Sequence, residues 1–263
     1  MKRVPIVLTI ICLLLTACAG APSPPPIATP RPRPTPRIRN TTYYTKRCWP
    51  ACHYDTTVVK PAPQPSIHDF DEELASGWTW INEDPTHWTL TEVPGALRIV
   101  SQGGSISEGL QNAQNILVRD APGGHFDIIT KVTFNPTSTF QNAAIFIQLN
   151  DSHLISLSRG YCREGDGPSC VGSGLYFDGP EPGCITAGVP TSAGTVFLML
   201  RKAGTSYVGY YRLGEGDWVE VSRCINLMMA PTKVGLAVTN GNRDPDIPEI
   251  PADFDFFTLV ERY

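Results

Sequence analysis

Residues 115–160 constrain the fold of this 263-residue chain more than any other stretch. Within residues 125–134, apolar or β-branched residues alternate with mostly polar ones. This period of two is typical of a strand with one buried face, because successive side chains of a strand point to opposite sides. Turn residues flank the segment at 121–124 and 135–138, and no amphipathic helix fits the pattern.

The neighbouring segments extend this β pattern. Residues 142–149 and 153–159 are predicted to form a hairpin across residues 150–152, which are Asn, Asp and Ser. About a dozen short strands, separated by Gly, Pro, Asn and Asp turns, are predicted in the chain as a whole. The sequence therefore predicts an all-β protein, a two-sheet antiparallel jelly-roll sandwich. Residues 67–263 are predicted to form this domain, because only they are rich enough in apolar residues to bury a core.

The charge of this predicted domain limits the classes of partner that it can bind. Residues 67–263 hold 12 Lys and Arg against 24 Asp and Glu. Nucleic-acid binding needs a basic footprint, so we expect no nucleic acid as a partner. An acidic domain is compatible with calcium or with neutral polymers.

The first 17 residues are predicted to be a lipoprotein signal peptide. Met1, Lys2 and Arg3 precede an apolar run, 4–15, that is too short to span a bilayer comfortably. The run ends in Leu-Thr-Ala-Cys, which is similar to a bacterial lipobox with Cys18 as the lipidated residue. We therefore expect a membrane anchor in the bacterial cell envelope that faces outside the cytoplasm. The alternative is an ordinary signal peptide with an incidental Cys.

Residues 18–66 are predicted to be a tether. They are rich in Pro and carry seven basic residues against one Asp. Such a composition favours extended polyproline II, so we interpret the segment as a stiff spacer attracted to anionic headgroups or wall polymers. A partner-binding Pro-rich motif is the alternative interpretation.

Six cysteines remain after Cys12 and Cys18 are set aside: Cys48, Cys52, Cys162, Cys170, Cys184 and Cys224. An even number in an oxidising compartment predicts up to three disulfides. The most local pairing joins Cys162 to Cys170 and Cys184 to Cys224, with Cys48 and Cys52 as a short staple. Six cysteines allow fifteen connectivities, so the spacing leaves the choice open.

Several segments together resemble a known family. They are residues 77–90, 94–99, 115–124, 131–137, 196–221 and 254–257. Their motifs are similar to the C-terminal β-sandwich of family-forty-three β-xylosidases, within the concanavalin A-like lectin/glucanase superfamily. The resemblance implies a jelly roll and a link to carbohydrates. Residues 159–190 depart from it, and we expect a long Gly- and Pro-rich loop there, stapled by cysteines.

The sequence offers little support for catalysis. The catalytic members of the superfamily carry a Glu-x-Asp-x-x-Glu triplet on one strand. In this chain that spacing occurs only at Glu215, Asp217 and Glu220, which begin in the predicted turn 214–216 and therefore do not share one strand. Glycoside hydrolysis uses two facing carboxylates. We therefore expect non-catalytic binding of a carbohydrate, with a protein-interaction or structural envelope module and a divergent glycoside hydrolase as alternatives.

Two sets of residues are candidate ligand contacts. Sugar rings stack on exposed aromatic faces, and the candidates for this role are Trp78, Trp88, Tyr207, Tyr210, Tyr211 and Trp218. A structural calcium is also expected where the first and last strands meet, with Asp69, Asp71, Asp253 and Asp255 as ligands. The alternatives are core packing for the aromatic residues and solvated carboxylates for the aspartates.

Overall fold

The computed structural model describes residues 66–71, 73–107, 109–241 and 246–262, together with strands Lys46–Cys48 (β1) and Cys52–Tyr54 (β2). The chain divides into two units, Met1–Val59 and Lys60–Tyr263. In the first unit, β1 and β2 pair antiparallel with Cys48 opposite Cys52. The predicted signal peptide, the lipidated Cys18 and the Cys48–Cys52 staple concern residues or side chains outside those described, and they stay predictions.

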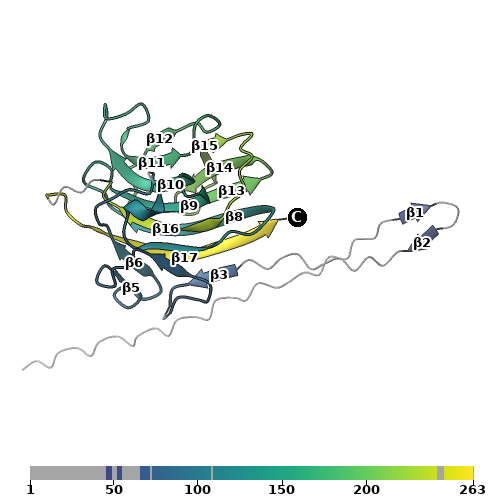
Figure 1. Cartoon of the computed structure of the whole chain (residues 1–263), viewed down its shortest axis with the longest axis horizontal. Helices are drawn as coiled ribbons and strands as arrows, with labels where there is room; N and C mark the ends of the chain where they lie inside the picture. The colour runs from purple at the N-terminus through teal and green to yellow at the C-terminus, as the bar shows by residue number, and fades with distance from the viewer. Residues whose placement is uncertain are drawn as a thin grey trace, which may run out of the picture. The chain divides into compact units, whose positions relative to one another are not determined.

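The second unit is a sandwich of two antiparallel sheets (Figure 1). The seven-stranded sheet runs in the order Ala187–Pro190 (β12), Gly172–Asp178 (β11), His153–Cys162 (β10), Asn142–Asn150 (β9), Lys233–Thr239 (β16), Ile116–Asp120 (β7) and Thr79–Ile81 (β4). The eight-stranded sheet runs in the order Val219–Cys224 (β15), Ser206–Arg212 (β14), Thr195–Ala203 (β13), His125–Phe134 (β8), Pro251–Arg262 (β17), Leu97–Val100 (β6) and Trp88–Thr89 (β5), with Ser66–Asp69 (β3) also paired to β17. The predicted fold class is confirmed.

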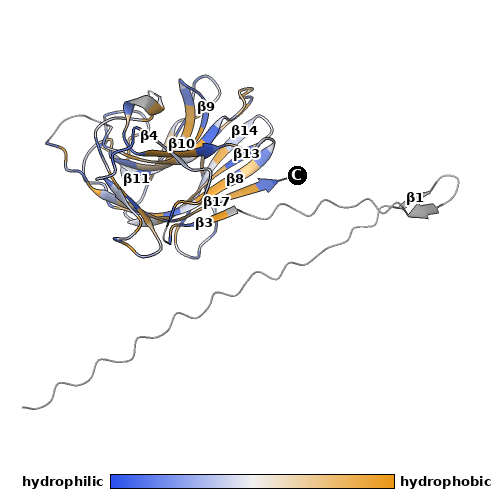
Figure 2. Ribbon diagram, turned by 60° about the horizontal axis from the view of Figure 1, so that its bottom comes forward, coloured by the Kyte–Doolittle hydropathy of each residue, from blue (hydrophilic) through white to orange (hydrophobic). Residues whose placement is uncertain are grey.

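The core lies between the two sheets. On β8, the alternate residues Phe126, Ile128, Val132 and Phe134 are fully buried, as the period of two predicts. Figure 2 shows hydrophobic and hydrophilic residues interleaved along the strands. Each strand thus gives one face to the core and keeps the other face for the outside of the sandwich.

A loop, which the structure describes at residues 101–107 and 109–115 and which we call loop 101–115, crosses the outer face of the seven-stranded sheet. It contains a short 3-10 helix, Leu110–Asn112 (η1). Ile106, Leu110 and Ala113 of this loop form a second apolar cluster with outward residues of β7, β9 and β16. The loop therefore covers the outward residues of β7, β9 and β16 on that face. No helix in the described part of the chain is long and apolar enough to cross a membrane.

The expected long loop at residues 159–190 is partly wrong. The segment contains the end of β10, all of β11 and all of β12. Its glycines allow close backbone approach: a Cβ on Gly188 would lie 2.1 Å from the carbonyl oxygen of Ser169, and one on Gly174 would lie 2.8 Å from that of Val189. Glycine there reflects crowding between neighbouring segments, although in the sequence it resembles turn chemistry.

Two predicted disulfides are confirmed. Cys162 bonds to Cys170, and Cys184 bonds to Cys224. The first closes a loop between β10 and β11, and the second joins the segment before β12 to the end of β15. Disulfides persist in oxidising compartments, so they indicate an extracytoplasmic location.

Candidate functional site

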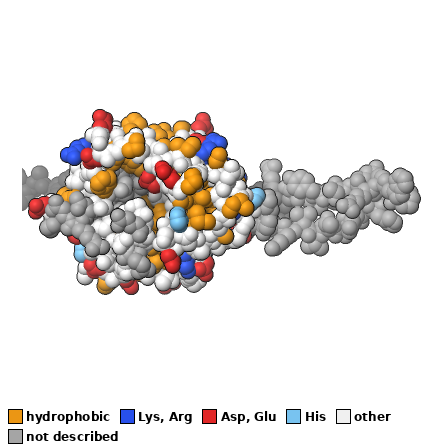
Figure 3. Space-filling model, turned by 45° about the horizontal axis from the view of Figure 1, so that its top comes forward, with side chains coloured by type: hydrophobic (Ala, Val, Ile, Leu, Met, Phe, Trp, Pro, Cys, Tyr) orange, Lys and Arg blue, Asp and Glu red, His pale blue; other side chains and the backbone are white. Residues whose placement is uncertain are grey.

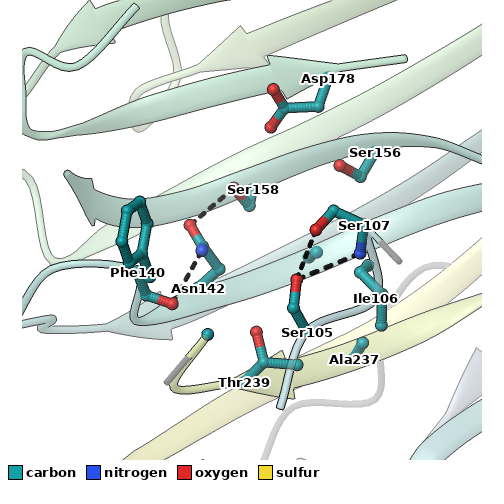
Figure 4. Close-up of a pocket in the computed structure, with 12 residues that line it drawn as sticks. Ser105, Ile106, Ser107, Phe140, Asn142, Ser156, Ser158, Asp178, Ala237 and Thr239 are labelled. Carbon is teal, nitrogen blue, oxygen red and sulfur yellow. Dashed lines mark hydrogen bonds between the residues drawn. The ribbon is translucent and has the colours of Figure 1, made fainter. Parts of the chain in front are cut away.

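A pocket of about 340 Å³ lies on the outer face of the seven-stranded sheet (Figure 4). Loop 101–115 forms one wall, and strands β9, β10, β11 and β16 supply residues on the sheet side. Most of the lining side chains are small or carry hydroxyl groups. The hydroxyl-bearing residues are Ser105, Ser107, Ser156, Ser158 and Thr239.

Small residues in register form the floor of this pocket. Ala144 on β9 pairs with Ala237 on β16 and with Ser158 on β10. Neighbouring strands lie about 4.8 Å apart, so these three residues form a continuous row across the sheet. A row of short side chains leaves a hollow that large side chains would fill.

Asn142 presents a polar group at one end of the hollow. Its Nδ2 donates to the carbonyl of Phe140 at 3.0 Å, and its Oδ1 accepts from the Ser158 hydroxyl at 3.2 Å. Gly160 stands opposite Asn142 on β10. A Cβ on Gly160 would lie 2.0 Å from Asn142 Oδ1, so this glycine provides the space that the amide occupies.

Phe140 forms an exposed aromatic rim, with 44% of its surface accessible. Its φ of 69° lies in the left-handed region, which is unfavourable for a large side chain. Tyr161 O accepts its N–H at 2.7 Å. The buried Gln141 fixes the turn, because its Oε1 accepts from the N–H of Thr137 at 2.8 Å and its Nε2 donates to Pro248 O at 2.8 Å. Backbone strain of this kind clusters at functional sites.

Asp178 places a carboxylate at the other end of the pocket, opposite Ser156 in the strand register. It is the only Asp or Glu among the described residues that line the pocket. Its side chain is accessible from the pocket, but the protein surrounds it on the other sides. This desolvation raises its pKa, and no described cation lies close enough to lower it again.

The site is therefore a hydroxyl-lined hollow with one aromatic rim and one unpaired carboxylate. A carboxylate accepts strong hydrogen bonds from hydroxyl groups, and an aromatic face stacks on an apolar ring face. On the part of the described surface visible in Figure 3, basic side chains are few and scattered. This chemistry suits a ligand rich in hydroxyl groups.

The six aromatic residues predicted as sugar contacts lie elsewhere. Trp78 packs edge-on against Phe257, with ring centroids 4.9 Å apart. Trp88 packs against Trp80 at 4.8 Å, and its Nε1 donates to Glu83 at 3.2 Å. Both tryptophans are half-buried at the edge of the core.

The aromatic residues of β14 separate onto two faces of the sheet. Tyr207 is fully buried, donates its hydroxyl to Met229 O at 3.1 Å, and has its pKa raised to about 12 by burial. A role for Tyr207 as a sugar contact is therefore wrong, because a ligand cannot reach it. Tyr211 packs on the core. Tyr210 lies on the outer face of the eight-stranded sheet, and Trp218 lies beside Arg212 of that face.

The predicted calcium ligands are not brought together as a set. Asp253 pairs with Arg98 at 2.6 Å, and Asp255 pairs with Lys131. Within the ranges that the structure describes, no three His, Cys, Asp or Glu residues form a group suited to a metal ion. Asp69 and Asp71 have exposed side chains. The calcium site stays a prediction, and the two C-terminal aspartates already have cationic partners.

Sequence reasoning missed the residues that line the pocket. A signal was present for part of the pocket, because Ser156 and Ser158 alternate with apolar residues in a strand that is otherwise hydrophobic. Polar residues at every second position mark the face turned away from the core. What the sequence does not give is the register that brings Asp178 beside Ser156.

Comparison with known proteins agrees with this architecture. Residues 68–259 match the family described as the beta-xylosidase C-terminal concanavalin A-like domain. A non-reducing end alpha-L-arabinofuranosidase from Bacteroides ovatus is 26% identical over 205 residues, which cover 74% of this chain and 37% of that protein.

Solved structures show the same fold. A GH43 protein from Bacillus licheniformis superposes with a TM-score of 0.62 at 22% identity, covering 74% of this chain and 39% of that one. A xylan beta-1,4-xylosidase from Bacillus halodurans gives a TM-score of 0.60 at 22% identity, with 76% and 40% covered. The chain thus spans well under half the length of these relatives. Since the family match extends over most of the chain, the protein belongs to the family of beta-xylosidase C-terminal concanavalin A-like domains.

Proposed function

We propose that this protein is a non-catalytic carbohydrate-binding module that recognises a polysaccharide outside the cell. The observation that carries the proposal is that Phe140 and Asp178 lie at opposite ends of the same hydroxyl-lined pocket. The aromatic ring supplies a stacking surface, and the unpaired carboxylate and the Asn142 amide supply hydrogen-bonding groups. Relatives whose names include xylosidase and arabinofuranosidase make plant-type pentose polymers the first candidates.

Binding fits the pocket better than hydrolysis does. Glycosidases place two carboxyl groups on either side of the scissile bond. The described lining offers Asp178 alone, facing hydroxyl groups on the side of loop 101–115. A single carboxylate can orient a sugar by accepting its hydroxyl protons, but it lacks the second acid or base that hydrolysis requires.

The proposal includes the mode of display. Lipidation at Cys18 would anchor the protein to a membrane of the bacterial envelope, and the Pro- and Arg-rich tether at 18–66 would hold the sandwich away from that surface. The two disulfides suit that oxidising side of the membrane. Globomycin blocks lipoprotein signal peptidase. Cells treated with it should therefore accumulate the uncleaved precursor if Cys18 is lipidated.

The test is a binding panel with the purified full chain. Xylan, arabinoxylan, arabinan and xyloglucan are titrated calorimetrically against wild type, Phe140→Ala, Asp178→Ala and Trp218→Ala. We expect at least one polymer to bind, with affinity reduced about tenfold or more by the first two substitutions and unchanged by the third, which lies away from the pocket. No binding to any polymer, or equal effects of all three substitutions, would contradict the proposal.

A second candidate function is docking of a protein partner. Two exposed apolar residues, Ile185 and Ile225, directly follow the bonded Cys184 and Cys224. Exposed apolar groups that lie together mark interaction sites. Crosslinking in the envelope, compared between wild type and Ile185→Glu, would identify a partner that depends on this patch.

A further inference from the structure

A second hollow continues the first one. It has a volume of about 220 Å³ and shares Ser107, Ser156 and Asp178 with the larger pocket. Beyond these three residues it extends to His153 at the β9–β10 hairpin and to Pro180 after β11. The two hollows therefore form one groove with Asp178 in its middle, and we call it the Asp178 groove.

The groove is longer than one sugar ring. It follows β10 from Ser158 in the first hollow to His153 in the second. Five residues of a strand advance about 17 Å. On β10, Ser158 of the first hollow and His153 of the second lie on either side of Ser156, which is paired with Asp178, so the ends of a bound ligand would lie away from the carboxylate.

The lining of the groove also has a net negative charge. The described residues that line its two hollows include no Lys or Arg, and they include one carboxylate, Asp178. The surrounding domain, residues 67–263, has an excess of 12 acidic residues. A uronate or sulfated chain would meet an uncompensated negative charge at the centre of the groove, whereas neutral hydroxyl groups would donate to it.

We propose that the Asp178 groove binds an internal segment of a neutral polysaccharide, several rings long, and discriminates against acidic chains. This inference rests on the proposed function and specifies its ligand. Phe140 stacks on a ring at one end, Asp178 accepts hydroxyl protons at the centre, and His153 contacts a ring at the far end. Affinity should therefore grow with chain length until both hollows are filled.

The first experiment measures dependence on length. The polymer that binds in the panel is hydrolysed to oligomers of one to six rings, and each oligomer is titrated against the full chain. We expect affinity to rise by about tenfold or more from one ring to four and then to level off, since each filled hollow adds contacts. A monosaccharide that binds as tightly as the hexamer would overturn the inference.

The second experiment uses a matched pair of variants. His153→Ala removes a residue of the far hollow, and His125→Ala removes an exposed histidine of the other sheet. We expect the first variant to weaken binding of four-ring oligomers severalfold while leaving single rings unchanged, and the second variant to have no effect. Equal binding of long oligomers by wild type and His153→Ala would overturn the two-hollow arrangement while leaving the Phe140 and Asp178 result intact.

The third experiment tests the charge. Oligogalacturonate of four rings is compared with the neutral four-ring oligomer on wild type and Asp178→Asn. We expect wild type to prefer the neutral chain by about tenfold or more, and Asp178→Asn to reduce that ratio. An unchanged ratio in the variant, or equal affinity of wild type for both chains, would overturn the proposed discrimination.

Discussion

Asp178, on the outer face of the seven-stranded sheet, differs from three aspartates on the outer face of the eight-stranded sheet. On the eight-stranded sheet, Asp127 is buried and accepts from Arg201 at 2.9 Å and from Arg262 at 2.8 Å. Asp253 and Asp255 on the same face pair with cations as well. On the seven-stranded sheet, the carboxylate of Asp178 faces a hollow without a cationic partner.

This difference separates structural from functional use of the same residue type. A paired carboxylate stabilises the sheet that carries it, and removing one partner of a buried pair is costly. An unpaired and partly desolvated carboxylate lacks a charged partner in the protein, and a bound ligand can supply the missing hydrogen bonds. Binding sites commonly reduce stability in this way. Asp127 and Asp178 should therefore respond in opposite ways to the same substitution.

The largest contrast concerns stability. Asp127→Asn should lower the free energy of unfolding by about 2 kcal/mol, because it removes the charged acceptor that two partly exposed arginines share. Urea denaturation of the full chain measures this loss. Asp178→Asn serves as the matched control and should show no loss. Equal destabilisation by both substitutions would remove the distinction between the faces.

A second contrast compares two glycines, one beside the pocket and one away from it, in their effect on polysaccharide binding. Gly160→Ala places a methyl group where the Asn142 amide lies, so polysaccharide affinity should fall about tenfold, or about 1.4 kcal/mol. Gly123→Ala is the control, because a Cβ there meets nothing within 4 Å. Calorimetric titration of both variants checks the expectation. Unchanged affinity in Gly160→Ala would show that the position of Asn142 does not matter to the ligand.

A smaller effect is expected from the partly exposed pair on the eight-stranded face. Arg98 contacts Asp253 through two nitrogens, at 2.6 and 2.9 Å, and this pairing raises the pKa of the guanidinium. Arg98→Met should cost about 1 kcal/mol of stability, less at high salt, and should leave polysaccharide binding unchanged. Denaturation at two salt concentrations, with a binding titration alongside, measures both. A loss of binding would connect this face to the ligand.

The smallest effect is a pH-dependent gain. Burial raises the pKa of Asp178 in the folded state, so its ionised form opposes folding once the pH exceeds the pKa of the unfolded chain, about 3.9. Asp178→Asn should therefore raise the melting temperature slightly at neutral pH and leave it unchanged in acid, where the wild-type carboxyl is protonated in both states. A melting temperature that falls at neutral pH would show that Asp178 stabilises the fold.

The sequence predicted the fold because its strands follow local rules. The alternation in residues 125–134 gives the buried face of β8 without any knowledge of its neighbours. The two confirmed disulfides match the most local pairing, since each joins consecutive cysteines of the chain, 8 and 40 residues apart. Strands in the segment 159–190 were missed because their glycines serve close contacts that the sequence does not display.

The groove could not be predicted from the sequence, for a different reason. It combines loop 101–115, the turn that presents Phe140, the register of β10 with β11, and a row of small residues on β9 and β16. These segments are far apart in the chain, and only tertiary pairing places them together. Tyr207 illustrates the converse: its type suits sugar binding, but the fold places it in the core.

The most direct test of the account is hydrogen–deuterium exchange of the full chain with and without a saturating neutral polysaccharide from the binding panel. We predict slower exchange in residues 101–115, 137–160 and 172–180, which border the Asp178 groove, and no change in residues 195–223 of the opposite sheet. Protection confined to residues 195–223, with none in the groove segments, would contradict the claim that the outer face of the seven-stranded sheet binds carbohydrate.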